Sequence, residues 1–214
     1  MVATGRSTSP AISTASTVSA AVPFPRRPLD PSDQVRRWYE NELGWATVPG
    51  IPLRLPLGLR FDVLDVPAEA GRSALRHLAP GSPVAVQGDR MRLLVAAGSG
   101  EELPGLLDWL EWGTLALDLT AIGEGGLMDA PVPPGRCSAT GARPPWTGTA
   151  ALRGAAVWLR PPEPGCEVEA SLPTLSALGG GGDAPDLVRL VNTVATHCHR
   201  LRLRRACAQP SALS

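Results

Sequence analysis

The sequence contains no lysine. All 20 basic residues are arginine, and 20 acidic residues balance them, so the formal net charge is zero. This balance excludes a general attraction to nucleic acid or to an anionic membrane, and any such binding has to be local. No run of about 18 apolar residues occurs, so no membrane-spanning helix is expected.

Cysteine is also scarce, with four residues in the whole chain. None of them forms a C-x-x-C pair, which argues against a zinc site. Such sparse use of cysteine fits a reducing compartment, and we expect a cytoplasmic location. The four positions are Cys137, Cys166, Cys198 and Cys207.

What is present suits one domain with tails, because 43% of the 214 residues are hydrophobic. Residues 1–28 are rich in Ser, Thr and Ala and contain no acidic residue, so they are predicted to be a disordered tail. Residues 29–206 are predicted to form the domain and residues 207–214 a second tail. Within the domain, the small and loop-forming residues of 135–153 and 179–184 predict two flexible loops.

The stretch from Leu57 to Thr120 carries the clearest periodicity. Apolar residues alternate over 59–66, over the hairpin 83–95 with its Gly88-Asp89 turn, and over 115–119. Helical patterns over 67–78 and 100–112 separate these strands. The order predicts an α+β fold with an RRM-like or ferredoxin-like βαββαβ antiparallel sheet, whose strands are ordered fourth, first, third, second.

Both helices of such a sheet cover one face, and strand alternation predicts which side chains lie on the other. The side chains expected beneath the helices are Phe61, Val63, Met91, Leu93, Leu117 and Leu119. Those expected on the open face are Arg60, Asp62, Leu64, Arg90, Arg92, Ala116 and Asp118. Two carboxylates flanked by arginines are what a divalent cation and a phosphate require. The alternative is a solvated face with cross-strand ion pairs.

Helices are expected at both ends of the domain. Asp30-Pro31 starts the first, whose apolar stripe includes Trp38, and Trp38 and Trp45 are both expected in the core. The second runs from about residue 185 to 206 and ends in an arginine-rich segment. That segment is a candidate surface for phosphate or for a protein partner, or a solvated basic helix end. Its arginines are Arg200, Arg202, Arg204 and Arg205.

A glycine-rich segment, Gly123-Glu124-Gly125-Gly126, follows the last strand of the predicted sheet. Glycines there allow backbone amides, for example at Gly125, to approach a phosphate. No helix N-terminus follows directly, so the segment is not a P-loop, and an ordinary turn is the favoured interpretation.

These segments together resemble a known family. The residues that carry the resemblance are Gly44-Trp45, Pro49-Gly50, the strand Leu59–Asp65, a strand that ends at Asp118, Gly123–Gly126, Ala130-Pro131 and Pro133-Pro134. In this order they resemble the bifunctional DNA primase/polymerase (prim-pol) N-terminal domain of the archaeo-eukaryotic primase superfamily, in its short stand-alone actinomycete form. The resemblance covers roughly residues 33–205. It implies an RRM-like sheet and metal-dependent nucleotidyl transfer with Mg²⁺ or Mn²⁺.

The resemblance also implies roles for individual residues. The family's Asp-x-Asp strand maps to Asp62 and, imperfectly, Asp65, and its later acidic residue maps to Asp118, so these three are the candidate catalytic residues and Asp62 with Asp118 the candidate metal ligands. The first two are three residues apart here, which places them on opposite faces of a regular strand. The family's third-strand histidine is replaced by Arg90-Met91-Arg92.

Two hypotheses follow. In the first, the chain is a prim-pol-like domain with a degenerate active site that binds a nucleotide or nucleic acid through phosphate contacts. Its candidate nucleotide-binding residues are Arg60, Arg90, Arg92 and Gly125. In the second, the chain is a non-catalytic interaction module that keeps the fold and binds a protein through its Trp-rich surfaces or its C-terminal helix.

Overall fold

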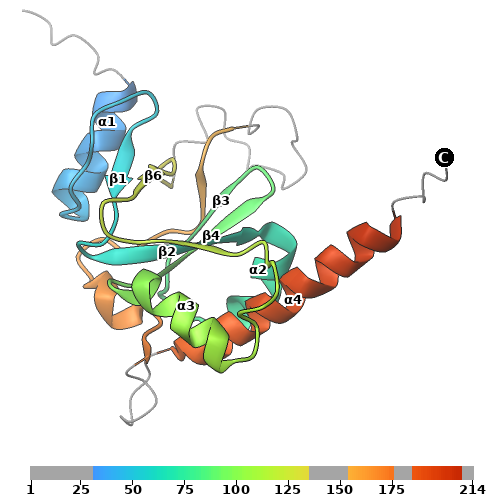
Figure 1. Cartoon of the computed structure of the whole chain (residues 1–214). Helices are drawn as coiled ribbons and strands as arrows, with labels where there is room; N and C mark the ends of the chain where they lie inside the picture. Colours follow the sequence, from blue (N-terminus) through green and yellow to red (C-terminus); the bar gives the residue numbers. More distant parts are fainter. Residues whose placement is uncertain (1–30, 135–153, 176–184, 209–214) are drawn as a thin grey trace, which may run out of the picture.

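The computed structural model describes residues 31–134, 154–175 and 185–208 (Figure 1). The predicted tail 1–28 and loop 135–153 lie outside these residues, as do the predicted loop 179–184 and all but two residues of the predicted tail 207–214. The described part is a mixed α+β structure with antiparallel sheets and four α-helices. No helix within it has the length and apolar character needed to cross a bilayer.

A five-stranded sheet forms the centre, with the strand order β5-β2-β4-β3-β7 and every neighbouring pair antiparallel. The strands are β2 (Phe61–Pro67), β3 (Val84–Gln87), β4 (Arg90–Ala96), β5 (Thr120–Ile122) and β7 (Val157–Arg160). The hairpin turn predicted at Gly88-Asp89 joins β3 to β4. The last predicted strand is displaced, because residues 115–119 lie outside β5.

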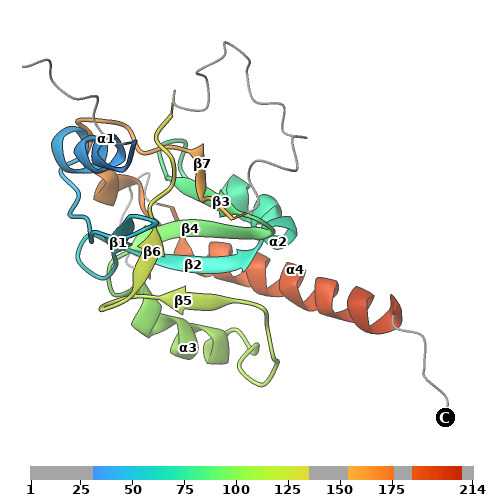
Figure 2. The same cartoon turned by 90° about the horizontal axis from the view of Figure 1, so that it is seen from above.

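Three helices cover one face of this sheet (Figures 1 and 2). They are α2 (Ala68–Ala74), which continues as the 3₁₀ turn η2 (Leu75–His77), α3 (Ser99–Trp109) and the long C-terminal helix α4 (Leu187–Ala208). The predicted C-terminal helix is therefore confirmed. Its buried stripe includes Leu190, Val194 and Cys198 and packs against Leu64, Val66 and Leu93 of the sheet.

The opposite face is covered at one end by a second layer. This layer contains α1 (Pro31–Arg37), the π-helical segment η1 (Trp38–Glu42) and the two-stranded ribbon of β1 (Arg54–Pro56) and β6 (Leu127–Asp129). Its core is rich in aromatic rings, and the expectation that Trp38 and Trp45 are buried is confirmed. The other large side chains of this core include Tyr39, Leu55, Leu57, Phe61, Leu94 and Met128.

Tyr39 holds this second layer together. Its hydroxyl donates to the carbonyl of Pro131 at 2.6 Å and accepts from Trp158 Nε1 at 3.0 Å. Burial raises the pKa of Tyr39 well above its ordinary value, and the hydrogen bond from Trp158 opposes that rise only in part. Close by, Val132 N donates to Ala156 O at 2.9 Å, beside a parallel bridge between Val132 and Val157.

The structure corrects the predicted facing of β2. Leu64 and Val66 lie beneath the helices, whereas Phe61 and Val63 belong to the aromatic core on the other side. Met91 and Leu93 do face the helices as expected, and Leu117 and Leu119 pack against that core. The prediction for β2 is wrong because its apolar residues occupy both faces, so alternation alone leaves the choice of face undetermined.

Candidate functional site

Four predicted site residues meet on the sheet face opposite α2, α3 and α4, at the end that the aromatic layer leaves uncovered. Asp65 lies opposite Arg92 in the β2–β4 register, and Arg90 lies two residues away on the same face of β4. Arg92 Nε lies 3.4 Å and Arg90 Nε 2.5 Å from the Asp65 carboxylate. Arg90 Nη1 also lies 2.5 Å from Asp118, and Arg205 Nη1 of α4 lies 3.6 Å from Asp118.

We call these five residues the ionic chain, in the order Arg92, Asp65, Arg90, Asp118 and Arg205. Three guanidinium groups face two carboxylates, so the chain carries one excess positive charge. Burial lowers the pKa of Arg90, but its hydrogen bonds to Asp118 and Asp65 outweigh this, and the net pKa is raised. Arg90 is therefore a permanent cation held between two carboxylates.

The two ends of the ionic chain differ in exposure. Arg92 is largely buried, and its Nη1 has no hydrogen-bond acceptor among the described residues. Asp118 and Arg205 are 46% and 66% exposed at the other end. A buried guanidinium nitrogen without an acceptor is unfavourable, and an anionic oxygen is the partner that would satisfy it best.

Asp62 is not part of this site, which corrects its predicted place on the open face. It is 1% exposed and lies beneath the N-terminus of α3, where its Oδ2 accepts a hydrogen bond of 2.8 Å from Gly100 N. A Cβ at Gly123 would stand 3.2 Å from the same oxygen. Asp62 therefore supplies a buried negative charge at the positive end of α3.

The side chains do not fit the divalent cation that the prim-pol resemblance implies. Asp62 lies three residues from Asp65 along β2, about 10 Å, toward the end of the strand away from Asp118. Asp65 and Asp118 do approach each other, but the Arg90 guanidinium lies between them. Among the described residues, no group of three or more His, Cys, Asp or Glu side chains is arranged to hold a metal ion.

Two further predicted site residues lie elsewhere. Arg60 precedes β2 and links two distant segments of the chain. Its Nε donates to Glu169 at 2.7 Å and its Nη1 to the carbonyl of Gly44 at 3.3 Å. Gly125 is exposed in the turn between β5 and β6, with φ of +73°, at the Asp62 end of the sheet. The ordinary-turn interpretation of this segment is the one that the geometry favours.

Two polar residues beside the ionic chain were not predicted. Gln87 lies opposite Arg90 in the β3–β4 register, and its Nε2 donates to Asp129 Oδ2 at 3.0 Å. Gln87 Oε1 is buried without a donor among the described residues. Alternation in β3 would have placed Gln87 on this face, but nothing in the sequence indicates that Asp129, 42 residues away, reaches it.

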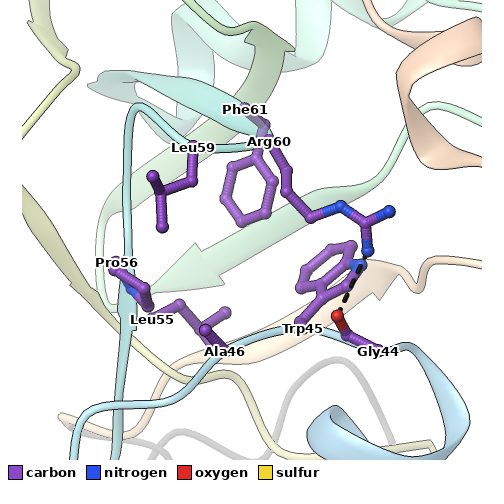
Figure 3. A pocket seen from close by; sticks show the side chains of 8 residues that line it. All are labelled: Gly44, Trp45, Ala46, Leu55, Pro56, Leu59, Arg60 and Phe61. Atoms are coloured by element: carbon purple, nitrogen blue, oxygen red, sulfur yellow. Dashed lines mark hydrogen bonds between the residues drawn. The ribbon is translucent and has the colours of Figure 1, made fainter.

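An apolar recess opens in the second layer, separate from the ionic chain (Figure 3). Its volume is about 160 Å³, and Trp45 and Phe61 form two of its walls. Figure 3 shows Arg60 extending past Trp45 at one side, with its hydrogen bond to Gly44. The lining residues are Gly44, Trp45, Ala46, Leu55, Pro56, Leu59, Arg60 and Phe61.

A larger polar recess of about 320 Å³ lies where η2 meets the start of α4. Its His77 Nε2 accepts from Arg76 Nε at 3.1 Å and lies 3.0 Å from Thr193 Oγ1. Burial lowers the pKa of His77, and the charges of Arg76 and Arg189 lower it further, although Asp186 opposes them. Asp186 also caps α4, since its carboxylate accepts from Val188 N, so this recess is explained by helix capping.

Comparison of the chain with protein-family models, with curated proteins and with solved structures finds no match.

Proposed function

We propose that the chain is a prim-pol-like domain that binds a phosphate-bearing ligand, a nucleotide or a nucleic acid strand, without metal-dependent nucleotidyl transfer. The observation that carries this proposal is the position of Arg90 between Asp65 and Asp118. A guanidinium takes the place that a divalent cation needs, and it leaves the excess positive charge on Arg92 and Arg205 at the two ends of the ionic chain.

The arrangement of the sheet supports the proposed fold type. The chain order β2, α2, β3, β4, α3, β5 alternates strands and helices as a βαββαβ unit does, and the four strands are neighbours in the order β5-β2-β4-β3. A ligand on the uncovered face of this sheet would meet Arg90 and Arg92 from β4. We infer that β4 replaces the histidine of the prim-pol pattern with phosphate-binding arginines.

The end of α4 extends the basic surface. Arg200, Arg202 and Arg204 are exposed there, beside Arg205 of the ionic chain. Arg204 pairs with Glu69 and Arg202 donates to the carbonyl of Ala116, so two of the three are partly engaged. Several phosphate contacts spread along a strip suit a polynucleotide better than a single phosphate, and they predict strong weakening by salt.

Binding of a fluorescein-labelled single-stranded oligodeoxythymidine, measured by anisotropy, tests the proposal. We expect the same affinity in EDTA, in Mg²⁺ and in Mn²⁺ at matched ionic strength. Arg92→Gln and Arg205→Gln should each weaken binding about 3- to 10-fold, because each removes phosphate-binding charge. Asp62→Asn should leave the affinity unchanged, since Asp62 is buried beneath α3.

Arg37→Gln is the matched control, because Arg37 is an exposed arginine on α1. An equal loss of affinity in Arg37→Gln and Arg92→Gln would mean that only total charge matters, and it would contradict the site. Incorporation of labelled deoxynucleotide onto a primed template in Mn²⁺ would contradict the absence of transfer.

The second candidate function is a protein-interaction module, and the exposed end of α4 favours it. Leu203 is 51% exposed there among arginines, and α4 projects beyond the rest of the described structure in Figures 1 and 2. Truncation after Leu190 cannot test this function, because Val191 and Val194 are buried core residues. Leu203→Ser can, because it removes the apolar side chain without adding charge among the arginines, and loss of a protein partner with unchanged oligonucleotide affinity would favour this function over the first.

A further inference from the structure

The apolar recess of Figure 3 has rigid, buried walls and a size suited to one side chain of a binding partner. Its walls are preformed, because Trp45, Leu55 and Phe61 are each at least 95% buried in the aromatic core. Its volume of about 160 Å³ is close to that of a cavity of about 150 Å³ that accommodates benzene. The recess therefore has room for one branched aliphatic or aromatic side chain.

One apolar side chain projects at this recess. Leu59 lines it and is nevertheless 73% exposed. The turn that carries Leu59 is fixed by Gly58, whose φ is +88° and where a Cβ would stand only 2.3 Å from Glu124 Cα. Leu59 is thus held outward by the backbone, next to a recess of matching size.

We propose that this surface is an interface between two copies of the chain, in which Leu59 of each copy occupies the recess of the other. A two-fold interface brings the same patch of both subunits together, so the patch must contain both the projecting group and its receptor. This patch contains both. An exposed apolar patch with a polar rim is also the usual mark of a protein-binding surface.

The charges at the rim favour a second copy over a strongly charged partner. Arg60, which lines the recess, forms an ion pair with Glu169 in which both side chains are about 40% exposed. A rim with both signs can complement itself across a two-fold axis, and a net charge of zero means no long-range repulsion between copies. The proposal does not depend on ligand binding at the ionic chain.

Sedimentation velocity of the full chain over a range of concentrations tests the interface. We expect a monomer–dimer equilibrium whose dissociation constant rises about 100-fold in Leu59→Asp, because two apolar anchors are lost together. Leu203→Asp is the matched control, since Leu203 is about half exposed on α4, away from the recess, and it should not change the equilibrium. Arg92→Gln should also leave it unchanged.

A mixing experiment gives the sharper test. Leu59→Ala removes the projecting side chain, and Ala46→Trp fills the recess from its exposed rim. Each variant alone should dimerise weakly, but an equal mixture should form heterodimers, because Leu59 of the Ala46→Trp copy can still enter the open recess of the Leu59→Ala copy. Circular dichroism checks that both variants fold.

Three results would overturn the proposal. One is a wild-type chain that stays monomeric at every concentration, which would leave the recess to a small apolar ligand or a different protein. Another is a dimer that Leu59→Asp does not weaken. The third is a mixture of folded variants that associates no better than either variant alone.

Discussion

The two faces of the central sheet are covered by different kinds of side chain. The face beneath α2, α3 and α4 is a continuous aliphatic core, and its charged residue, Asp62, is bonded to the backbone of a helix end. The opposite face is divided between an aromatic layer at one end and the ionic chain at the other. The first face is filled mainly by aliphatic side chains, so we assign stability chiefly to that face and the candidate function to the other side of the same strands.

Alanine substitutions of two buried leucines compare how much the aliphatic core and the aromatic layer each stabilise the fold. Leu64 faces the helices and Leu94 faces the aromatic layer, and both are fully buried. We expect Leu64→Ala and Leu94→Ala each to lower the free energy of unfolding by about 3 kcal/mol, because both leave a cavity. Urea denaturation measures this, and a loss under about 1 kcal/mol for Leu94→Ala alone would show that the second layer adds little stability.

The role of Asp62 can be separated from that of the ionic chain. Asp62→Ala should lower the free energy of unfolding by about 2 kcal/mol, because Gly100 N loses its buried acceptor. Asp62→Asn keeps an acceptor oxygen and should cost about 1 kcal/mol, the part due to the charge at the helix end. Urea denaturation of both variants measures the difference. Equal losses would mean that the negative charge, and not the hydrogen bond, is what α3 requires.

A substitution at Tyr39 tests how much of the stability of the aromatic layer comes from hydrogen bonding rather than from packing. Tyr39→Phe keeps the ring and removes the hydroxyl that links Pro131 to Trp158. We expect a loss of about 1 kcal/mol in the free energy of unfolding, since Trp158 Nε1 and Pro131 O lose one partner each. Thermal unfolding followed by tryptophan fluorescence measures it, with Trp158→Phe as the paired variant, and additive losses would argue against a shared network.

The smallest expected effect concerns pH. The folded pKa of His77 lies below its ordinary value of about 6.5, so between these two values the unfolded chain binds the extra proton. The contribution of His77 is therefore fully present above about pH 6.5 and is lost as the pH falls from there through the lower folded pKa. Urea denaturation at several pH values should give a weaker acid dependence for His77→Gln than for the wild type, and parallel curves would contradict this role.

The sequence was sufficient for features that depend on local patterns. Alternating residues located β2, β3 and β4, and the stripe through Leu190 and Val194 located α4. Trp38 and Trp45 were expected in the core and lie there. These features are encoded within a few neighbouring residues, so reading along the chain recovers them.

Long-range packing accounts for what the sequence did not reveal. β2 is apolar on both faces, and only the presence of the aromatic layer decides that Phe61 turns toward it. Asp62 accepts a hydrogen bond from the N-terminus of α3 and therefore does not lie on the open face. Arg205 reaches Asp118 only because α4 runs beside the sheet. The recess forms between residues from four separate turns and strands, and no periodicity signals such a gap.

The bridge between Val132 and Val157 has a practical consequence. It keeps two residues that are far apart in the sequence side by side, and Val132 N donates a hydrogen bond to Ala156 O. A reporter or affinity module whose own termini are adjacent would match the spacing of these two residues, so joining it at them would not force them apart. The fold thus provides its own attachment point for biosensor construction.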